Sequence, residues 1–262
     1  MQRISLLRIF ICCCFVSMLL VSSCKRAPLP PPVVLFDQGH GQHFLVDQDG
    51  PLNLTQFGQV FKEQGFEVRA MADRLSERNL HGIAALIISG PFKPLEPEEI
   101  GAIIKYVEEG GQLCVMLHIG MPVLDLLTKL GVAVANAPVH EQDRIINANP
   151  KDFYVDGLPD HPLTKEVDRI AFFGTWPLNT GQGANVIAKT GPKAWVDLNR
   201  DGRLGPGDAE QEFQVMVTGQ RGHGHFVVIG DDATFQNRFF VDGNRKLAEN
   251  LANWFKEGSY YR

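Results

Sequence analysis

The sequence predicts an α/β domain built on a mostly parallel sheet with helices on its faces. From residue 33 onward, short apolar or β-branched runs alternate with amphipathic segments of helix length, which is typical of parallel strands joined by crossover helices. One of these runs, AALIIS at 84–89, has the continuous apolar character of a buried strand. The 262 residues are 44% hydrophobic and 21% charged, as in a globular protein with a sizeable core.

The first half of the domain contains the clearest elements. The segment 95–111, LEPEEIGAIIKYVEEGG, has Pro97 in its first turn, acids near its amino end and Gly110-Gly111 as its stop, so it predicts a helix. A second helix, ending before Gly65, places Phe57, Val60 and Phe61 on one face. In chain order, we expect strand 33–36, helix 55–64, strand 66–70, strand 84–89, helix 95–111, strand 112–117 and helix 123–130.

The second half has a different pattern. Residues 135–168 show little periodicity and two proline-containing turns, so we expect an excursion from the α/β pattern there. The loop TGQRGHG at 218–224 separates two apolar runs and predicts a hairpin. A helix at 244–256 closes the domain. The expected strands are 169–173, 184–189, 193–197, 213–218 and 225–230.

The amino terminus has the parts of a secretory signal peptide, namely a basic start and a 13-residue apolar run at 9–21. The run ends in Val-Ser-Ser-Cys, which resembles the lipobox of bacterial lipoproteins. That resemblance implies cleavage after residue 23 and lipidation of Cys24, which would anchor the chain to a bilayer through its acyl groups. We therefore expect a signal peptide at 1–23, a proline-rich tether at 24–32 and one domain at 33–262. An uncleaved anchor or an ordinary cleaved signal is the alternative.

The lipoprotein prediction places the domain in the bacterial cell envelope. Lys25 after the lipidated cysteine favours the outer membrane, facing the periplasm, if the cell is Gram-negative. Cleavage would leave Cys114 as the domain's single free thiol, so no disulfide is expected. The net charge of −5 offers no excess positive charge for a phosphate backbone and argues against nucleic-acid partners.

Four motifs together resemble one family. They are LFDQGHGQHF at 35–44, LEPEEIGAIIKYVEEGGQLCVML at 95–117, VIGDDATFQN at 228–237 and NRKLAENLANWF at 244–255. In these motifs the chain is similar to GIFT-type, class I glutamine-amidotransferase-like domains. Such domains occur in intraflagellar-transport proteins, in auxiliary components of gliding-motility-type ABC transport systems and in bacterial proteins of unknown function. The resemblance implies a flavodoxin-like, mostly parallel sheet flanked by helices, with an added β-hairpin region.

The resemblance also implies that the amidotransferase machinery has been lost. Amidotransferases carry a nucleophilic Cys on a tight turn between strand and helix. Here His118-Ile119-Gly120 stand at that turn, and Cys114 lies inside the preceding strand, where we expect a buried core thiol. We therefore expect no catalytic residue.

Polar residues follow four of the expected strands and should converge at the carboxyl edge of the sheet, where open α/β sheets bind ligands. Their donors and acceptors suit a small polar ligand such as a carbohydrate. A structural role, in which the acids cap loops and the histidines are internally bonded, is the alternative. A metal site formed by His40 and His43 with the neighbouring carboxylates is another. The expected ligand-binding residues are Asp37, His40, His43, His118, Asp231 and Asp232.

A calcium-type loop, DLNRDGRLGPGD, occupies 197–208. Calcium takes six to eight oxygens, and a twelve-residue EF-hand-type loop provides them from positions 1, 3, 5, 7 and 12, with Gly at 6. The sequence therefore predicts a structural Ca²⁺ held in the added hairpin region, although the last ligand is Asp and the flanks resemble strands. An ion-free Asp/Gly-rich hairpin loop is the alternative. The expected ligands are Asp197, Asn199, Asp201, the carbonyl of Arg203, and Asp208.

These observations favour a membrane-anchored, non-catalytic binding module of the cell envelope, with envelope transport proteins as candidate partners. One alternative is an envelope hydrolase in which His40 or His118 acts as base and Asp37 or Asp231 orients it. The other is a structural adaptor that binds a protein through a sheet edge or a surface patch.

Overall fold

The computed structural model describes residues 30–135, 137–181 and 184–259. The predicted signal peptide and the lipidation site Cys24 lie outside the described residues, as does most of the tether. Within the described part of the chain, no helix has both the length and the apolar character needed to cross a bilayer.

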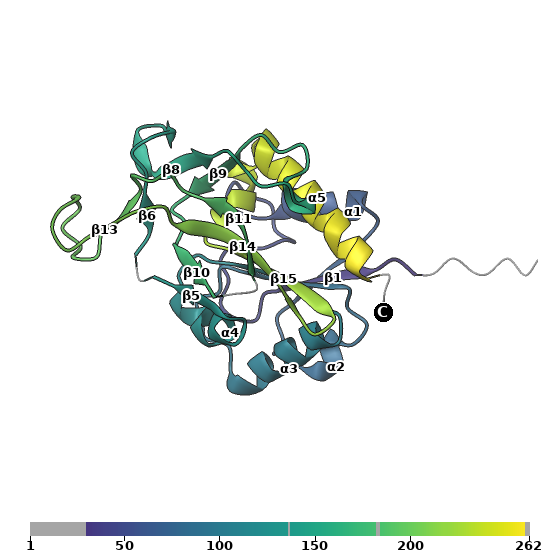
Figure 1. The fold of residues 1–262 in the computed structure, drawn as a ribbon. Helices are drawn as coiled ribbons and strands as arrows, with labels where there is room; N and C mark the ends of the chain where they lie inside the picture. The colour runs from purple at the N-terminus through teal and green to yellow at the C-terminus, as the bar shows by residue number, and fades with distance from the viewer. Residues whose placement is uncertain (1–29, 136, 182–183, 260–262) are drawn as a thin grey trace, which may run out of the picture. The chain divides into compact units, whose positions relative to one another are not determined.

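A mixed, mostly parallel sheet of nine strands organises the fold (Figure 1). Its strands run in the order β2-β1-β3-β4-β15-β14-β10-β5, and β11 also pairs with β14. The first five are mutually parallel, and β14 is antiparallel to β15, β10 and β11. The strands are β1 (Val33–Asp37), β2 (Glu67–Met71), β3 (Ala85–Ser89), β4 (Gln112–Met116), β5 (Val132–Val134), β10 (Leu178–Thr180), β11 (Ala184–Lys189), β14 (Gln214–Arg221) and β15 (Gly224–Ile229).

Helices cover both faces of this sheet. In Figure 1, α1 and α5 lie on one side, and α2, α3 and α4 lie on the other. Each side buries its own apolar core, one around Phe57, Phe61 and Phe255 and the other around Ile103 and Leu127. The helices are α1 (Thr55–Glu63), α2 (Glu77–Leu80), α3 (Pro97–Glu108), α4 (Leu124–Lys129) and α5 (Asp242–Ser259), with 3-10 turns η1 (Met121–Val123), η2 (Pro162–Thr164), η3 (Ala233–Phe235) and η4 (Asn237–Phe239).

The predicted central elements are confirmed because their sequences allow little else. The strands β1, β3 and β4 are buried at every position, which is why their sequences are predominantly apolar. Helix α3 has Pro97 in its first turn and buries Ile100, Ile103 and Val107. After its end, Gly110 has a φ of +105°, a conformation that favours glycine. The hairpin predicted at 218–224 joins β14 to β15.

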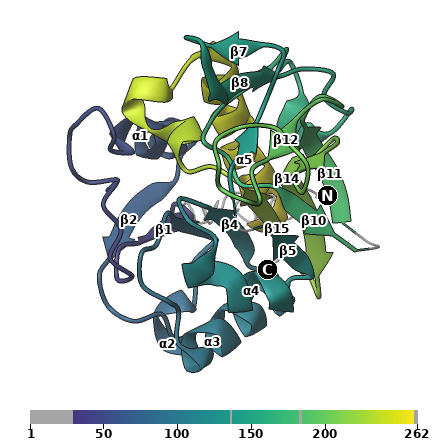
Figure 2. The ribbon, with the colours of Figure 1, turned by 90° about the vertical axis from the view of Figure 1, so that its left-hand side faces the viewer.

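The excursion predicted at 135–168 lies outside the central sheet and contains short strands that were not predicted. They are β6 (Val139–His140), β7 (Ile145–Ile146) and β8 (Asn149–Val155), and β8 pairs with β9 (Ile170–Phe173) in a separate three-stranded sheet. Figure 2 shows β7 and β8 on the same side of the central sheet as α1 and α5. The sequence conceals β8 because its first half is exposed and polar, and only its end enters the core.

The predicted calcium-type loop connects two short strands. They are β12 (Trp195–Val196) and β13 (Ala209–Glu210), which pair antiparallel, and β12 also pairs with β6. In Figure 1 this loop projects away from the central sheet beyond β13. The strand predicted at 193–197 is therefore present in shortened form and belongs to a small sheet of its own.

Candidate functional site

The carboxyl ends of β1, β3, β4 and β15 meet at one edge of the sheet and carry the polar residues singled out in the sequence. The five parallel strands lie side by side in the order β2-β1-β3-β4-β15. The chain adds β2 on one side of β1 and the later strands on the other, so the order reverses between β1 and β3, where open sheets of this kind bind ligands. The loops that follow β1 and β3 are bonded together, because the backbone N–H groups of Phe92 and Lys93 both donate to the His40 carbonyl at 2.9 Å.

A buried network joins Asp37, His40 and Glu99. His40 Nδ1 lies 2.7 Å from Asp37 Oδ2, and His40 Nε2 lies 3.1 and 3.2 Å from the two carboxylate oxygens of Glu99. Gln42 donates to Asp37 Oδ2 at 2.6 Å and accepts from the His40 backbone N–H at 2.8 Å. Both ring nitrogens of His40 face carboxylates, so the ring is fully bonded when both carry protons.

The charges of this network stabilise one another. Burial lowers the pKa of His40, but the hydrogen bonds and charges of Asp37 and Glu99 outweigh it, and the net pKa is raised. Burial also opposes ionisation of Glu99. Its net pKa is nevertheless lowered, because the backbone N–H groups of Glu96 and Leu75 and the His40 ring all bond its carboxylate. In this arrangement the network supports the loops and leaves no ring nitrogen of His40 for a ligand.

A second pair, His118 and Asp232, faces outward. His118 follows β4, and its Nδ1 lies 3.1 Å from Asp232 Oδ1. The His118 side chain is 39% exposed, whereas that of Asp232 is 2% exposed. The hydrogen bond that Asp232 accepts from the protonated ring raises the pKa of His118 against the opposing effect of burial, and burial raises the pKa of Asp232. The Nε2 of His118 is thus the polar atom that this pair offers to a ligand.

Aromatic rings surround His118. Phe92 stacks on His43 with centroids 4.3 Å apart and lies 5.0 Å from the His118 ring. Phe44 lies 5.3 Å from the same ring, and the indole N–H of Trp176 donates to the His118 carbonyl at 2.9 Å. Phe92 therefore lies between His43 and His118 and links them. Phe92 was not among the site residues predicted from the sequence. Its place directly after the Gly90-Pro91 turn that ends β3 is the signal that could have identified it.

The carboxylate of the adjacent Asp231 bonds to β9 and η3, whereas that of Asp232 bonds to His118. The Asp231 carboxylate accepts hydrogen bonds from the backbone N–H groups of Phe173 and Ala233 and from the Thr234 hydroxyl. Burial and the charge of Asp232 raise the pKa of Asp231 to about 8, although these three donors oppose the change. These bonds tie the end of β15 to β9 and η3. A ligand contact for Asp231 stays a prediction.

The turn where an amidotransferase would carry its nucleophile holds His118, and the one free thiol among the described residues lies elsewhere. Cys114 is buried in the middle of β4. Burial raises the pKa of its thiol far above the ordinary value, so it is not poised for nucleophilic attack. The structure thus agrees with the expectation of a core thiol.

The predicted calcium ligands form a bonded loop. Asp197 accepts from the backbone N–H groups of Asp201 and Gly202 at 3.2 and 2.9 Å. Asp208 accepts from those of Leu198 and Gly205 at 3.0 and 2.8 Å. Within the described ranges, no group of three or more His, Cys, Asp or Glu side chains is arranged to hold a metal ion. Calcium binding by this loop therefore stays a prediction, as does the alternative metal site at the strand ends.

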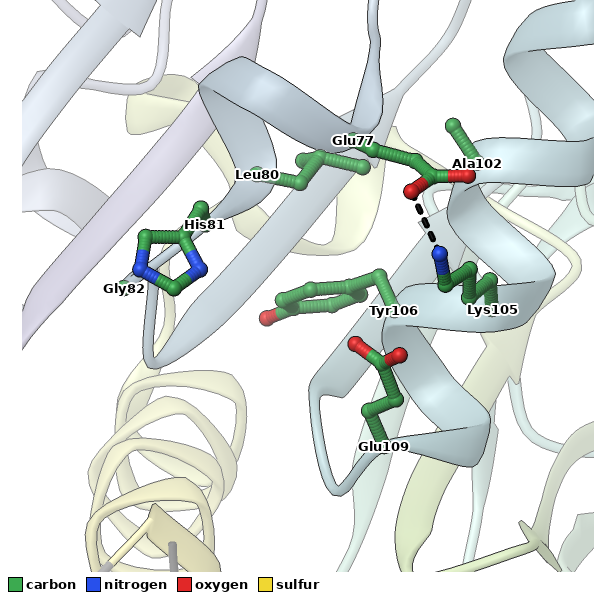
Figure 3. Close-up of a pocket in the computed structure, with 8 residues that line it drawn as sticks. All are labelled: Glu77, Leu80, His81, Gly82, Ala102, Lys105, Tyr106 and Glu109. Atoms are coloured by element: carbon green, nitrogen blue, oxygen red, sulfur yellow. Dashed lines mark hydrogen bonds and ion pairs between the residues drawn. The ribbon is translucent and has the colours of Figure 1, made fainter.

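A separate cavity of about 490 Å³ lies between α2 and α3, away from these strand ends (Figure 3). It is bordered by the ion pair of Glu77 and Lys105 and by the Tyr106 ring. His81 precedes β3 and Glu109 precedes β4, so the cavity lies toward the amino ends of these strands. None of the predicted ligand-binding residues lines it.

Comparison with known proteins gives a family and a fold. Residues 47–252 match the model of a domain of unknown function, DUF4350. No curated protein matches the chain. Among solved structures, the mmIFT52 N-terminal domain is similar with a TM-score of 0.69 and 18% identity, over 85% of this chain and 96% of that one.

Two bacterial structures are also similar. A ThuA-like protein from Bacteroides uniformis has a TM-score of 0.53 and 15% identity, over 87% of this chain and 92% of that one. A cytoplasmic protein from Salmonella typhimurium LT2 has a TM-score of 0.58 and 14% identity, over 86% of this chain and 99% of that one. At these identities the likenesses show the fold, which is that of class I glutamine-amidotransferase-like domains.

Proposed function

The chain belongs to the DUF4350 family, a domain of unknown function, and we propose a function from its own candidate site. The protein is a non-catalytic module that binds a small polar ligand, a carbohydrate, at the carboxyl edge of the sheet. The observation that carries the proposal is the pair of His118 and Asp232, in which a buried carboxylate orients an exposed imidazole among aromatic rings. An oriented imidazole with a free Nε2 can exchange a hydrogen bond with a hydroxyl group.

The surroundings of His118 suit a sugar. Sugars present hydroxyl groups at their rims and C–H groups on their faces, and they therefore need both polar partners and flat apolar surfaces. Phe44 and Phe92 provide such surfaces beside His118, and both are partly exposed. The half-buried Trp176 extends the aromatic border on the side of β10.

Absence of catalysis is supported by the turn after β4. An acyl-transfer enzyme of this fold needs a nucleophile there, and His118 occupies the place. The one thiol among the described residues, that of Cys114, is buried and protonated at neutral pH. His40, the other candidate base, has both ring nitrogens bonded to carboxylates.

A hydrolase is the second candidate, because an imidazole oriented by a carboxylate is also a general base. His118 meets that geometry with Asp232 as its orienting group, in place of the Asp37 or Asp231 expected from the sequence. The two candidates differ in what the same variants lose. A hydrolase variant loses turnover while keeping its fold, whereas a binding module has no turnover to lose.

The test is thermal unfolding of the purified protein against a panel of sugars, cell-wall fragments and nucleotides, with product analysis of each mixture. A ligand at 100 times its Kd stabilises by about 2.7 kcal/mol, which corresponds to several degrees at about 2–4 °C per kcal/mol. We expect a sugar to give this shift, and His118→Ala or Asp232→Asn to abolish it. His223→Ala, at the exposed tip of the β14–β15 hairpin, is the matched control and should keep the shift.

The outcomes of this test separate the candidates. Release of product that stops in His118→Ala would replace the binding module by a hydrolase. A sugar response that survives in both site variants would place the ligand elsewhere. A panel without any response would favour the adaptor, which binds a protein through a sheet edge or surface patch.

We also propose that the chain is a lipoprotein of the cell envelope, anchored through Cys24 and auxiliary to an ABC-type transport assembly. The anchor is supported by the lipobox-like Val-Ser-Ser-Cys and by the proline-rich tether that follows it, and the transport role by the resemblance of the motifs to auxiliary components of ABC transport systems. Labelling of expressing cells with a clickable palmitate analogue should mark the wild-type chain and leave Cys24→Ser unlabelled. Equal labelling of both would contradict the anchor.

We propose that the loop at 197–208 binds a structural Ca²⁺, as its ligand spacing suggests. Titration with Ca²⁺ should release or absorb heat and raise the melting temperature, with a Kd of about 10⁻⁴–10⁻³ M, the range of extracellular modules. Asp201→Ala should abolish both effects, whereas Asp160→Ala, an exposed acid outside the loop, should change neither. An unchanged melting temperature in wild-type protein would contradict calcium binding.

A further inference from the structure

A small cavity between β8 and the loop at 197–208 carries unpaired positive charge. It measures about 320 Å³, and its lining includes His140, Lys151, Trp176, Asp197 and Arg200. Neither Lys151 nor Arg200 forms an ion pair within the described part of the chain. Two free cations in one hollow are notable in a chain whose net charge is −5.

The one acid at this cavity is already engaged. Both carboxylate oxygens of Asp197 accept backbone N–H groups from their own loop, those of Asp201 and Gly202. The cations belong to different elements, Lys151 to β8 and Arg200 to the loop after β12. The cavity therefore brings together two positive side chains from separate parts of the chain. Neither forms an ion pair within the described residues, although the charge of Lys151 partly offsets the effect of burial on the pKa of the neighbouring Asp152.

The same cavity adjoins the proposed sugar site through one side chain. Trp176 is one of the residues that line the cavity, and its indole N–H donates to the His118 carbonyl at 2.9 Å. Trp176 is therefore shared by the cavity lining and by the hydrogen bond to the backbone of His118. On its other side the cavity is bordered by His140, whose ring stacks on Trp195 with centroids 4.2 Å apart.

We propose that this cavity binds the carboxylate of an acidic sugar whose ring lies against Trp176, so that the ligand of the His118 site is an anionic carbohydrate. The inference rests on the proposed sugar-binding function and specifies the class of sugar. Guanidinium and ammonium groups are the natural partners of a carboxylate, and a flat indole suits the face of a sugar ring. The neutral part of the ligand extends toward Phe92 and His118.

The experiment compares glucuronate with glucose on the full chain, by following the indole signals of the three tryptophans in NMR titrations. We expect glucuronate to bind about five to ten times more tightly at low salt, because partly exposed ion pairs contribute modestly. The preference should approach parity near 1 M salt, where the Debye length is about 3 Å. The Trp176 signal should respond most strongly.

Matched variants locate the carboxylate. Lys151→Gln and Arg200→Gln should each lower glucuronate affinity about threefold and leave glucose affinity unchanged. Arg203→Gln removes the same charge from the same loop, but Arg203 does not line the cavity, so it should keep the preference. Equal affinities for both sugars, or a preference that survives in Lys151→Gln and Arg200→Gln, would overturn the inference.

Two further measurements distinguish failure of this inference from failure of the proposed function: sugar binding by Asp232→Asn, and binding of inorganic phosphate by the wild-type protein. Both proposals would be supported if Asp232→Asn bound neither glucose nor glucuronate, while Arg200→Gln still bound both sugars and lost only its preference for glucuronate. An Arg200-dependent glucuronate signal that is unchanged in Asp232→Asn would support the carboxylate site and overturn the sugar site at His118. Binding of phosphate in place of either sugar would overturn the acidic-sugar assignment.

Discussion

Glu99→Ala is expected to lower the free energy of unfolding by about 3–5 kcal/mol, the range observed when one partner of a buried ion pair is removed. The Glu99 carboxylate is buried and bonds three groups at once: the His40 ring, the backbone N–H of Leu75 and that of Glu96. Alanine would leave all three without their acceptor. Urea or guanidinium denaturation of both proteins gives the difference.

Glu98→Ala is the matched control, because it removes an acid from the same turn of α3. Glu98 is exposed, so its loss costs only its favourable interaction with the helix dipole, about 0.3–1 kcal/mol. If the two variants lost the same stability, the buried network of His40 would have no structural role and the loops after β1 and β3 would be held by other contacts.

The pH dependence of the same variant provides an independent measurement. The net pKa of His40 is raised in the folded protein, because Asp37 and Glu99 outweigh the effect of burial. Its stabilisation is therefore complete below the unfolded pKa of about 6.5 and is lost as the pH rises through the folded value. The stability difference between wild type and Glu99→Ala should accordingly shrink on going from pH 6 to alkaline pH. Asp231 titrates in both proteins and cancels from the difference.

The central sheet could be predicted because its inner parallel strands β1, β3 and β4 are short, buried and predominantly apolar. The run at 84–89 and the helix at 95–111 left few alternatives, and both are present as β3 and α3. The strands β6 and β7 could not be predicted in the same way. Each is two residues long, and pairing with another strand, rather than its own sequence, makes it a strand: β6 pairs with the distant β12, and β7 pairs with the following β8.

The sequence predicted where the candidate site lies in the fold, and it did not predict which of its side chains form hydrogen bonds with one another. Strand ends place Asp37, His118 and Asp232 at one edge of the sheet. The bond from His40 to Glu99 joins residues 59 positions apart, and that from His118 to Asp232 joins residues 114 apart. The direction in which the backbone leaves β15 decides whether Asp231 or Asp232 bonds to His118. Because the two residues are identical and adjacent, the sequence does not reveal that direction.

Gly90→Ala is expected to lower the free energy of unfolding by about 3–5 kcal/mol, as in other substitutions that combine backbone strain with a steric clash. Gly90 has a φ of +53°, and a Cβ at this position would lie 2.2 Å from Asp232 Oδ2 and 3.2 Å from His118 Cβ. The buried carboxylate must move, and its hydrogen bond to His118 should break. Because that bond is the largest cause of the raised pKa of His118, NMR titration should show this pKa falling.

Gly82→Ala separates the clash from the backbone strain, because Gly82 has a φ of +75° and no atom within 4 Å of its ideal Cβ. It should cost only the left-handed conformation, about 1–2 kcal/mol, and leave the pKa of His118 raised. Equal losses in both variants, with His118 unchanged in both, would contradict the close fit of Asp232 against Gly90. The expected contrast would show that the missing side chain of Gly90 makes room for the carboxylate that orients His118, so that a backbone requirement after β3 determines the geometry of the candidate site.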